Sequence, residues 1–242
     1  MFPLRDNIFR KQFPLVTWLI IVVNVAIFYM ESSLSEDVAS QIIYRFAIVP
    51  SRYGSPGSFL GFQLPIADYL PILTSMFMHG SWLHVIGNMW FLYIFGASVE
   101  DRMGRLRYFF FYILCGIMAG FIYIYFDLQS TVPSIGASGA IAGVMGAYLV
   151  LFPTARIVTL ILIIIIPWFV ELPALLYIGI WFFYQVLLET IYASAPGLGG
   201  GGLAWWAHIG GFVSGMLLLF PFRVKGLFQR QHYPDEQHRY IN

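Results

Sequence analysis

The side chains best suited to chemistry in this sequence are a serine and a histidine that stand in separate apolar segments. Ser138 occupies the third position of a run of small residues, 136–139, and His208 comes shortly before the glycine pair 210–211. An imidazole that takes the proton of a serine hydroxyl turns that hydroxyl into a nucleophile. The two residues therefore predict acyl transfer through Ser138, with His208 as the base.

A histidine and an asparagine four positions apart offer the hydrogen-bond donors that such a reaction needs. His84 and Asn88 share one face of a helix, because residues four apart are neighbours on a helix surface. Acyl transfer is accelerated by donors placed where negative charge develops on the substrate oxygen. The candidates are the His84 and Asn88 side chains and the backbone N–H of Ser138, where a helix start also favours negative charge. Since no Asp or Glu stands at the same depth to orient the imidazole, we expect a dyad and not a triad.

Each of these residues also has a simpler interpretation as part of helix packing. Ser138 alone is equally well explained as a small residue in a packing seam, while membrane histidines and asparagines often bond carbonyls or join helices. The depth of these residues in the membrane distinguishes the two interpretations. Counted at about 1.5 Å per residue from the inner end of each span, Ser138, His208, His84 and Asn88 lie about 21, 22, 24 and 18 Å up a core roughly 30 Å thick. Four polar side chains at one level favour a common site.

The composition places these residues in a membrane. Of the 242 residues, 59% are hydrophobic, 19% aromatic and only 10% charged, whereas soluble domains carry about 25% charged residues. The net charge of +1 gives no indication of a nucleic-acid partner. The single cysteine, Cys115, excludes a disulfide framework and a thiol metal site. The zinc motif His-Glu-x-x-His and a pair of intramembrane aspartates are both missing, so we expect no metal and no cofactor.

Apolar runs predict an all-α polytopic membrane protein, a six-transmembrane-helix bundle with a short, recessed fourth helix. The expected spans are 15–30, 73–99, 108–126, 138–152, 172–192 and 204–222. They form a core, 15–222, between an N-terminal tail, 1–14, and a C-terminal tail, 223–242. The first outer loop, about 31–71, is expected to lie in the membrane interface.

Two further segments connect the later spans. The apolar run 157–166 is too short for a seventh span, and we interpret it as a re-entrant or interfacial connection. The glycine-rich stretch 196–202 has the composition of a flexible linker.

The positions of positive charge predict orientation. Of the thirteen Lys and Arg residues, all except Arg45 and Arg52 fall in segments on the side of the two termini. Because positively charged segments are retained in the cytoplasm, both termini are expected to be cytoplasmic and the site to open to the outer side. Short tails and the lack of a targeting segment favour a multi-pass protein of a prokaryotic cell membrane.

Small residues predict how the fourth and sixth spans meet. A residue without a bulky side chain at every fourth position lets two membrane helices press their backbones together. One such series descends the fourth span from Ser138, and another descends the sixth span from His208. The residues expected to give structural support to the site are Gly136, Gly139, Gly143, Gly211 and Gly215. This packing would bring the base to the nucleophile.

With these residues in place, the sequence resembles the rhomboid family of intramembrane serine proteases. Residues 136–139 match its G-x-S-G nucleophile motif, 207–211 its A-H-x-x-G base motif, and 84–88 its H-x-x-x-N oxyanion motif. Residues 96–104 fit its G-x-x-x-E-x-x-x-G motif, with Glu100 at the centre. The resemblance covers the six-span core. One departure is that the first loop has no Trp-Arg pair, which many members carry there.

The resemblance implies cleavage of transmembrane protein substrates within the lipid bilayer, near the outer end of a helix, by Ser138 and His208. A peptide bond inside a membrane helix is hydrogen-bonded, so the substrate must first unwind locally. We expect it to enter sideways, past the second or fifth span. The sequence indicates neither the natural substrate nor the oligomeric state.

Two other functions stay open. A non-catalytic rhomboid-like protein would bind client transmembrane helices without cutting them. A solute or proton pathway would use His79, His84 and His208 as a relay. Taken alone, His79 is expected to be structural, because five residues from His84 it points elsewhere on a helix.

Overall fold

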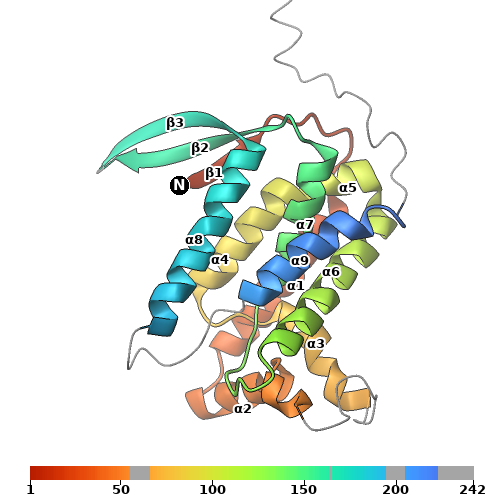
Figure 1. The fold of residues 1–242 in the computed structure, drawn as a ribbon, viewed down its shortest axis with the longest axis vertical. Helices are drawn as coiled ribbons and strands as arrows, with labels where there is room; N and C mark the ends of the chain where they lie inside the picture. The colour runs from red at the N-terminus through yellow and green to blue at the C-terminus, as the bar shows by residue number, and fades with distance from the viewer. Residues whose placement is uncertain (55–65, 164, 195–204, 223–242) are drawn as a thin grey trace, which may run out of the picture.

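The computed structural model describes residues 1–54, 66–163, 165–194 and 205–222. Within these residues, helices predominate and run alongside one another as a bundle (Figure 1). The linker expected at 196–202 and the C-terminal tail expected at 223–242 lie outside the described residues. So does the part of the first loop from 55 to 65.

The expected spans appear as helices in chain order. They are α1 (Leu15–Ser32), α4 (Trp82–Phe91) continued by the π-helical turn η4 (Leu92–Gly96) and α5 (Ala97–Met103), α6 (Arg105–Phe126), α7 (Ser138–Leu151), α8 (Ala174–Ser194) and α9 (Trp205–Leu218). Three stretches among the described residues are long and apolar enough to cross a membrane: Leu15–Ser32, Trp82–Met103 and Arg105–Phe126. The expectation of a helical membrane bundle is confirmed.

The second span begins later than the sequence suggested. Residues before it form two short helical pieces, α3 (Leu70–Thr74) and η3 (Ser75–Phe77), and the long helix starts only at Trp82. The side chain of Ser81, in extended conformation, accepts a hydrogen bond from the backbone N–H of His84 at 3.2 Å. This cap satisfies one of the amide groups left free at a helix start, and it separates His79 from the helix that carries His84.

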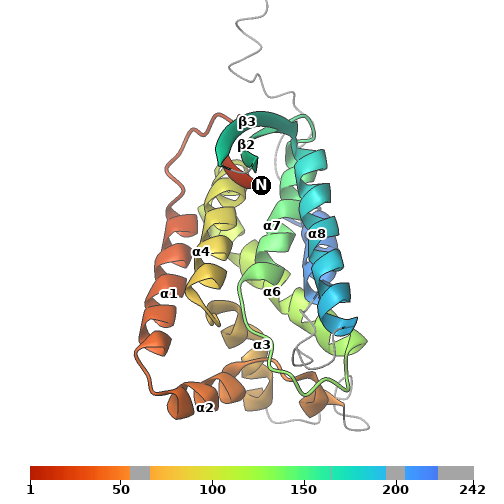
Figure 2. The same cartoon turned by 90° about the vertical axis from the view of Figure 1, so that its left-hand side faces the viewer.

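The fourth span, α7, is short and lies at the centre of the bundle. Every residue from Gly139 to Tyr148 is buried, and α7 packs against both α6 and α9. The connection from α6 passes near α2 and returns into the bundle before α7 begins (Figure 2). It is held by backbone hydrogen bonds between Ser134 and Ile48 and from Gly136 to the carbonyl of Ser75. Ser138 is therefore the first residue of a helix that begins inside the bundle and not at the end of the bundle.

The first outer loop contains α2 (Glu36–Phe46), η1 (Pro50–Tyr53) and η2 (Ile66–Tyr69). Helix α2 lies across the end of the bundle (Figure 2). The depth of this loop in a membrane stays a prediction.

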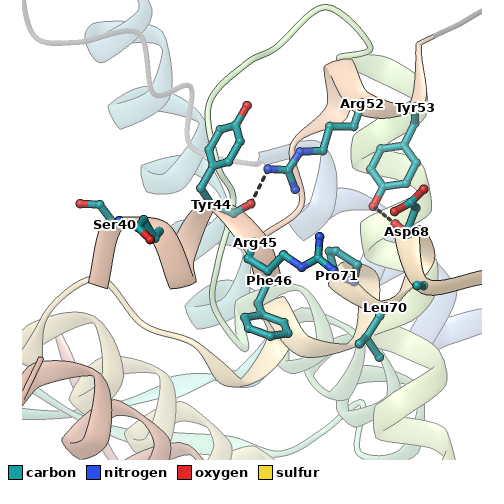
Figure 3. Close-up of a pocket in the computed structure, with 11 residues that line it drawn as sticks. Ser40, Tyr44, Arg45, Phe46, Arg52, Tyr53, Asp68, Leu70 and Pro71 are labelled. Carbon is teal, nitrogen blue, oxygen red and sulfur yellow. Dashed lines mark hydrogen bonds between the residues drawn. The ribbon is translucent and has the colours of Figure 1, made fainter. Parts of the chain in front are cut away.

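A cavity of about 980 Å³ opens among these elements, and Figure 3 shows Arg45 and Arg52 at its edge. Burial raises the pKa of the Tyr53 hydroxyl to about 12, so this hydroxyl stays protonated and donates to the carbonyl of Asp68. The cavity contains none of the residues expected to do chemistry.

A small sheet covers the opposite end of the bundle. Strands β2 (Arg156–Ile163) and β3 (Ile166–Pro173) form an antiparallel hairpin, and β1 (Phe2–Asp6) pairs with β2 to give the order β1-β2-β3. The sequence does not predict these strands: it predicts a re-entrant or interfacial connection at 157–166 and a tail at 1–14. A short apolar run has no periodicity that separates strand from helix, and the β1 partner lies some 150 positions away in the chain.

The motif around Glu100 joins the first span to the second. Its buried carboxylate accepts hydrogen bonds from the backbone N–H groups of Val16 and Thr17 and from the Thr17 hydroxyl, at 2.9, 2.8 and 2.7 Å. These amides belong to the first turn of α1, where an anionic group is favoured by the helix dipole and by the unpaired N–H groups. Glu100 thus fixes α1 to α5 at the end of the bundle away from Ser138.

Candidate active site

Ser138 and His208 meet between α7 and α9. The Nε2 atom of His208 lies 2.7 Å from the Oγ atom of Ser138, although the residues are 70 positions apart. His208 is only 7% exposed. The distance is within the range of a serine hydroxyl that donates to an imidazole, which is the arrangement a serine nucleophile requires before it attacks.

The close approach of α7 and α9 makes this contact possible. A methyl group added at Gly211 would collide with the carbonyl of Gly139, and one added at Gly215 would collide with the carbonyl of Gly143. The two backbones therefore touch where the sequence predicted a small-residue seam. His208, one turn before Gly211, is carried to the first residue of α7 by this packing.

Gly136 brings the helix start against His84 and Asn88. Its φ of +132° is a conformation that residues with a side chain rarely adopt. A Cβ atom at this position would lie 2.9 Å from two atoms of the His84 ring and 3.6 Å from the amide nitrogen of Asn88. The side chains of α4 thus face the backbone two residues before Ser138, and the four expected residues come together in one place.

His79 also belongs to this cluster, contrary to its expected direction. Its Nε2 atom lies 3.0 Å from the amide nitrogen of Asn88, and its ring packs edge-on against that of His84 with centroids 5.1 Å apart. The expectation failed because helical spacing does not apply: His79 precedes the Ser81 cap and is not on α4. The chain there turns back, so a residue outside the helix reaches the face that carries His84 and Asn88.

Two aromatic residues on the side toward α8 were not anticipated. The Trp181 ring of α8 packs against His208 with centroids 5.9 Å apart, and Phe91 of α4 packs against Trp181 at 5.8 Å. Together they close the space between α4 and α8 beside the base. Their sequence signal is weak, because an aromatic residue in an apolar span is common and marks no particular site.

The second ring nitrogen of His208 completes the description of the pair. Among the described residues, Nδ1 of His208 has no hydrogen-bond partner. No group of three or more His, Cys, Asp or Glu residues in that part of the chain is placed to hold a metal ion. Within the described part of the chain, the arrangement is a serine and a histidine without a carboxylate that orients the imidazole.

Comparison with known proteins identifies the family of this chain. A model of the rhomboid domain matches residues 67–225, which include Ser138, His208, His84 and Asn88. This chain belongs to the rhomboid family. As a rhomboid with apolar helices long enough to cross a bilayer, it is an integral membrane protein.

Three of the relatives, two from a plant and one from yeast, show the extent of the similarity. The chain is 27% identical to RHOMBOID-like protein 6, mitochondrial, of Arabidopsis thaliana over 83% of its own length and 66% of the relative. It is 26% identical to RHOMBOID-like protein 1 of the same plant, over 93% of the chain and 58% of the relative. It is 30% identical to Rhomboid protein 1, mitochondrial, of Saccharomyces cerevisiae, over 63% of the chain and 41% of the relative. The rhomboid described here therefore spans less than two thirds of the length of these relatives.

Proposed function

We propose that this rhomboid is an intramembrane serine endopeptidase that hydrolyses peptide bonds in or near the transmembrane helices of other proteins. The observation that carries the proposal is the 2.7 Å contact between Ser138 Oγ and His208 Nε2. A serine that only filled a packing seam would need no imidazole at this distance.

The reaction begins when Ser138 Oγ attacks the carbonyl carbon of the scissile bond and His208 Nε2 takes the hydroxyl proton. The carbonyl oxygen becomes an anion in the tetrahedral intermediate. His208 then gives its proton to the leaving amine as the C–N bond breaks, which leaves an acyl-enzyme ester on Ser138. Water hydrolyses this ester by the same steps, with His208 as the base, and releases the carboxyl product and free Ser138.

We propose three donors that stabilise the anionic oxygen. The first amide groups of a helix have no partner within the helix, so the backbone N–H of Ser138 is available at the start of α7. His84 and Asn88 lie against Gly136, beside that helix start. We propose that these three groups form the oxyanion site and that Asn88→Ala lowers turnover about 10- to 1000-fold, by less than loss of Ser138.

The substrate reaches the dyad from the side of the bundle. The contact between Phe91 and Trp181 closes the space between α4 and α8 next to His208. We propose that a substrate helix enters when these helices separate and that it unwinds before attack, because its backbone is hydrogen-bonded while helical. A covalent cross-link between α4 and α8 that leaves cleavage intact would contradict this route.

The domain limits and the orientation are part of the same proposal. Residues 15–222 hold the spans of the protease core, to which β1 of the N-terminal segment adds a strand. The segments 1–14 and 223–242 are proposed to be cytoplasmic, with the Ser138 end of the bundle toward the outer side. The distribution of Lys and Arg supports this orientation. The host membrane is proposed to be a prokaryotic cell membrane.

The test is incubation of the purified full chain in lipid vesicles with a panel of model transmembrane substrates. Wild type is expected to cut at least one substrate, whereas Ser138→Ala and His208→Ala are expected to cut none. A serine-directed phosphonate probe should label wild type at Ser138, and labelling should be lost in His208→Ala. Binding of substrates by wild type without cleavage would instead favour a non-catalytic protein that binds client helices.

A solute or proton pathway gives a different result in the same vesicles. A relay through the histidines would conduct in wild type and equally in Ser138→Ala, because the hydroxyl has no part in it. Cleavage by wild type with no ion flux excludes the relay.

A further inference from the structure

The β2–β3 hairpin exposes an apolar surface that nothing in the described chain covers. Ile165, at its tip, is 85% exposed, and Trp168 and Phe169 of β3 are each 61% exposed. Ten consecutive residues, 160–169, contain no polar side chain. Soluble surfaces rarely leave such a patch open, so it indicates contact with a membrane or a partner.

Both faces of the hairpin are apolar toward the tip. Leu160 pairs with Phe169 and Ile161 pairs with Trp168, and neighbouring residues of a strand point to opposite faces. The charged residues of the two strands, Arg156 and Glu171, stand at the base. A protein partner that docks on a sheet covers one face, whereas immersion in lipid accommodates both.

The hairpin extends sideways from the bundle and not further along the direction of its helices. Figure 1 shows it leaving the bundle beside the first turn of α8, with its tip at about the level of that turn, and Figure 2 shows it as an arc over the same end. Each strand has eight residues, so the hairpin reaches about 26 Å at 3.3 Å per residue. Helix α8 follows β3 directly, and its exposed Leu175 and Leu176 continue the apolar surface onto the bundle.

We propose that the β2–β3 hairpin lies in the lipid interface of the membrane leaflet farther from Ser138, as a lateral anchor beside the bundle. Among the described residues, β3 is an edge strand, whose backbone N–H and C=O groups have no strand partner on one side. Such groups are costly in the hydrocarbon core, which excludes deep insertion. At the interface, headgroups and water satisfy the backbone, and tryptophan is favoured there.

The anchor would fix the end of α7 relative to the membrane. Strand β2 begins five residues after α7 ends at Leu151, and α8 begins at Ala174, directly after β3. Strand β1 adds the N-terminal segment to the same sheet. A hairpin held at the interface therefore sets the height of both α7 and α8 in the bilayer.

The experiment places an environment-sensitive fluorophore on the full chain in phosphatidylcholine–phosphatidylglycerol vesicles. Ile165→Cys gives an exposed thiol, while the native Cys115 is buried, and unsubstituted protein measures background labelling. Lys11→Cys, on an exposed turn before α1, is the comparison in water, and Phe183→Cys, on the exposed face of α8, is the comparison inside the bilayer. Lipids that carry a nitroxide at the headgroup, near the headgroup or deep in the acyl chain then quench each label.

The label at 165 is expected to emit at shorter wavelength than that at 11. It should be quenched most by nitroxides at or near the headgroup, whereas the label at 183 should be quenched most by the deep nitroxide. Emission at 165 that matches position 11, with no quenching by any lipid nitroxide, overturns the proposal. The proposal is also overturned if energy transfer between copies labelled at 165 rises with the protein-to-lipid ratio while lipid quenching is absent. In that case the edge strand pairs with a second copy of the chain. Thermal unfolding of each labelled variant checks that the bundle is intact.

Discussion

The amide nitrogen of Asn88 lies 3.0 Å from Nε2 of His79, a residue that stands outside the helix carrying Asn88. An amide nitrogen is always a donor, so Nε2 of His79 accepts one of its two hydrogens. The second hydrogen of the Asn88 amide stays available for the substrate oxygen that becomes negatively charged beside Ser138. We therefore propose that His79 is a positioning residue, which orients the proposed oxyanion donor Asn88 without touching the substrate.

His79→Ala is expected to lower kcat of the proposed protease by less than Asn88→Ala does, with KM nearly unchanged, because the donor remains but is no longer held. His79→Gln, whose side-chain oxygen can accept from Asn88, should recover part of the rate. In an Asn88→Ala background, His79→Ala should cost little more. Equal losses from His79→Ala in both backgrounds would show that it acts independently of Asn88.

Gly215→Ala should disturb the protein through the seam between α7 and α9. The added methyl group would collide with the carbonyl of Gly143, so the helices must separate and His208 must move from Ser138. Overpacking of this kind costs about 1–3 kcal/mol, and cleavage should fall together with the unfolding temperature. Gly179→Ala is the matched control, since among the described residues no atom beyond its chain neighbours and the nearby backbone of its own helix lies within 4 Å of a Cβ there.

Gly146→Val tests the same seam nearer the C-terminal end of α7. A Cβ at Gly146 would meet the carbonyl of Phe212 on α9, so cleavage should be impaired although no reacting group is altered. Probe labelling of Ser138 measures the result directly. Wild-type labelling in Gly146→Val would mean that the seam tolerates separation of the helices.

Glu100→Ala should destabilise the bundle. It would leave the half-buried amide of Val16 and the buried amide of Thr17 without the carboxylate that accepts from them, at a cost of about 1–3 kcal/mol for an unsatisfied buried group. Thermal unfolding in detergent measures the change. Asp101→Ala is the control, because Asp101 also accepts from backbone N–H groups but in an exposed position. The loss of stability should be smaller for Asp101→Ala, which separates the effect of burial from that of hydrogen bonding.

Phe91→Ala should accelerate cleavage of transmembrane substrates. The Phe91–Trp181 contact closes the space between α4 and α8, and an aromatic pair contributes about 0.5–1.5 kcal/mol. Its loss would raise the open population and the rate roughly 2- to 10-fold. Labelling by a small soluble probe, which needs no lateral opening, should change little. A reduced rate for both substrates and probe would place Phe91 in the structure of the site and not in a gate.

Much of the bundle was predictable because its signals are local. An apolar run of about 20 residues identifies a span wherever its neighbours lie, and the fourth-position spacing of Gly139 and Gly143 identifies a packing face from the helix period alone. The prediction that small residues on α7 and α9 meet was confirmed. The hairpin at 156–173 was missed because its strand character depends on a partner strand and on the turn that joins them, and not on periodicity.

By itself, the sequence determined that this is a membrane protein of helical spans and which Ser, His and Asn residues could share one depth. Composition and helical rise are properties of each segment, so no partner is needed to infer them. Only the tertiary structure decided that Ser138 and His208 are in contact, that His79 bonds Asn88, and that Trp181 covers the base. These relationships depend on the direction of each side chain and on helix backbones that lie too close for a methyl group to fit between them. The spacing of residues along the chain specifies neither.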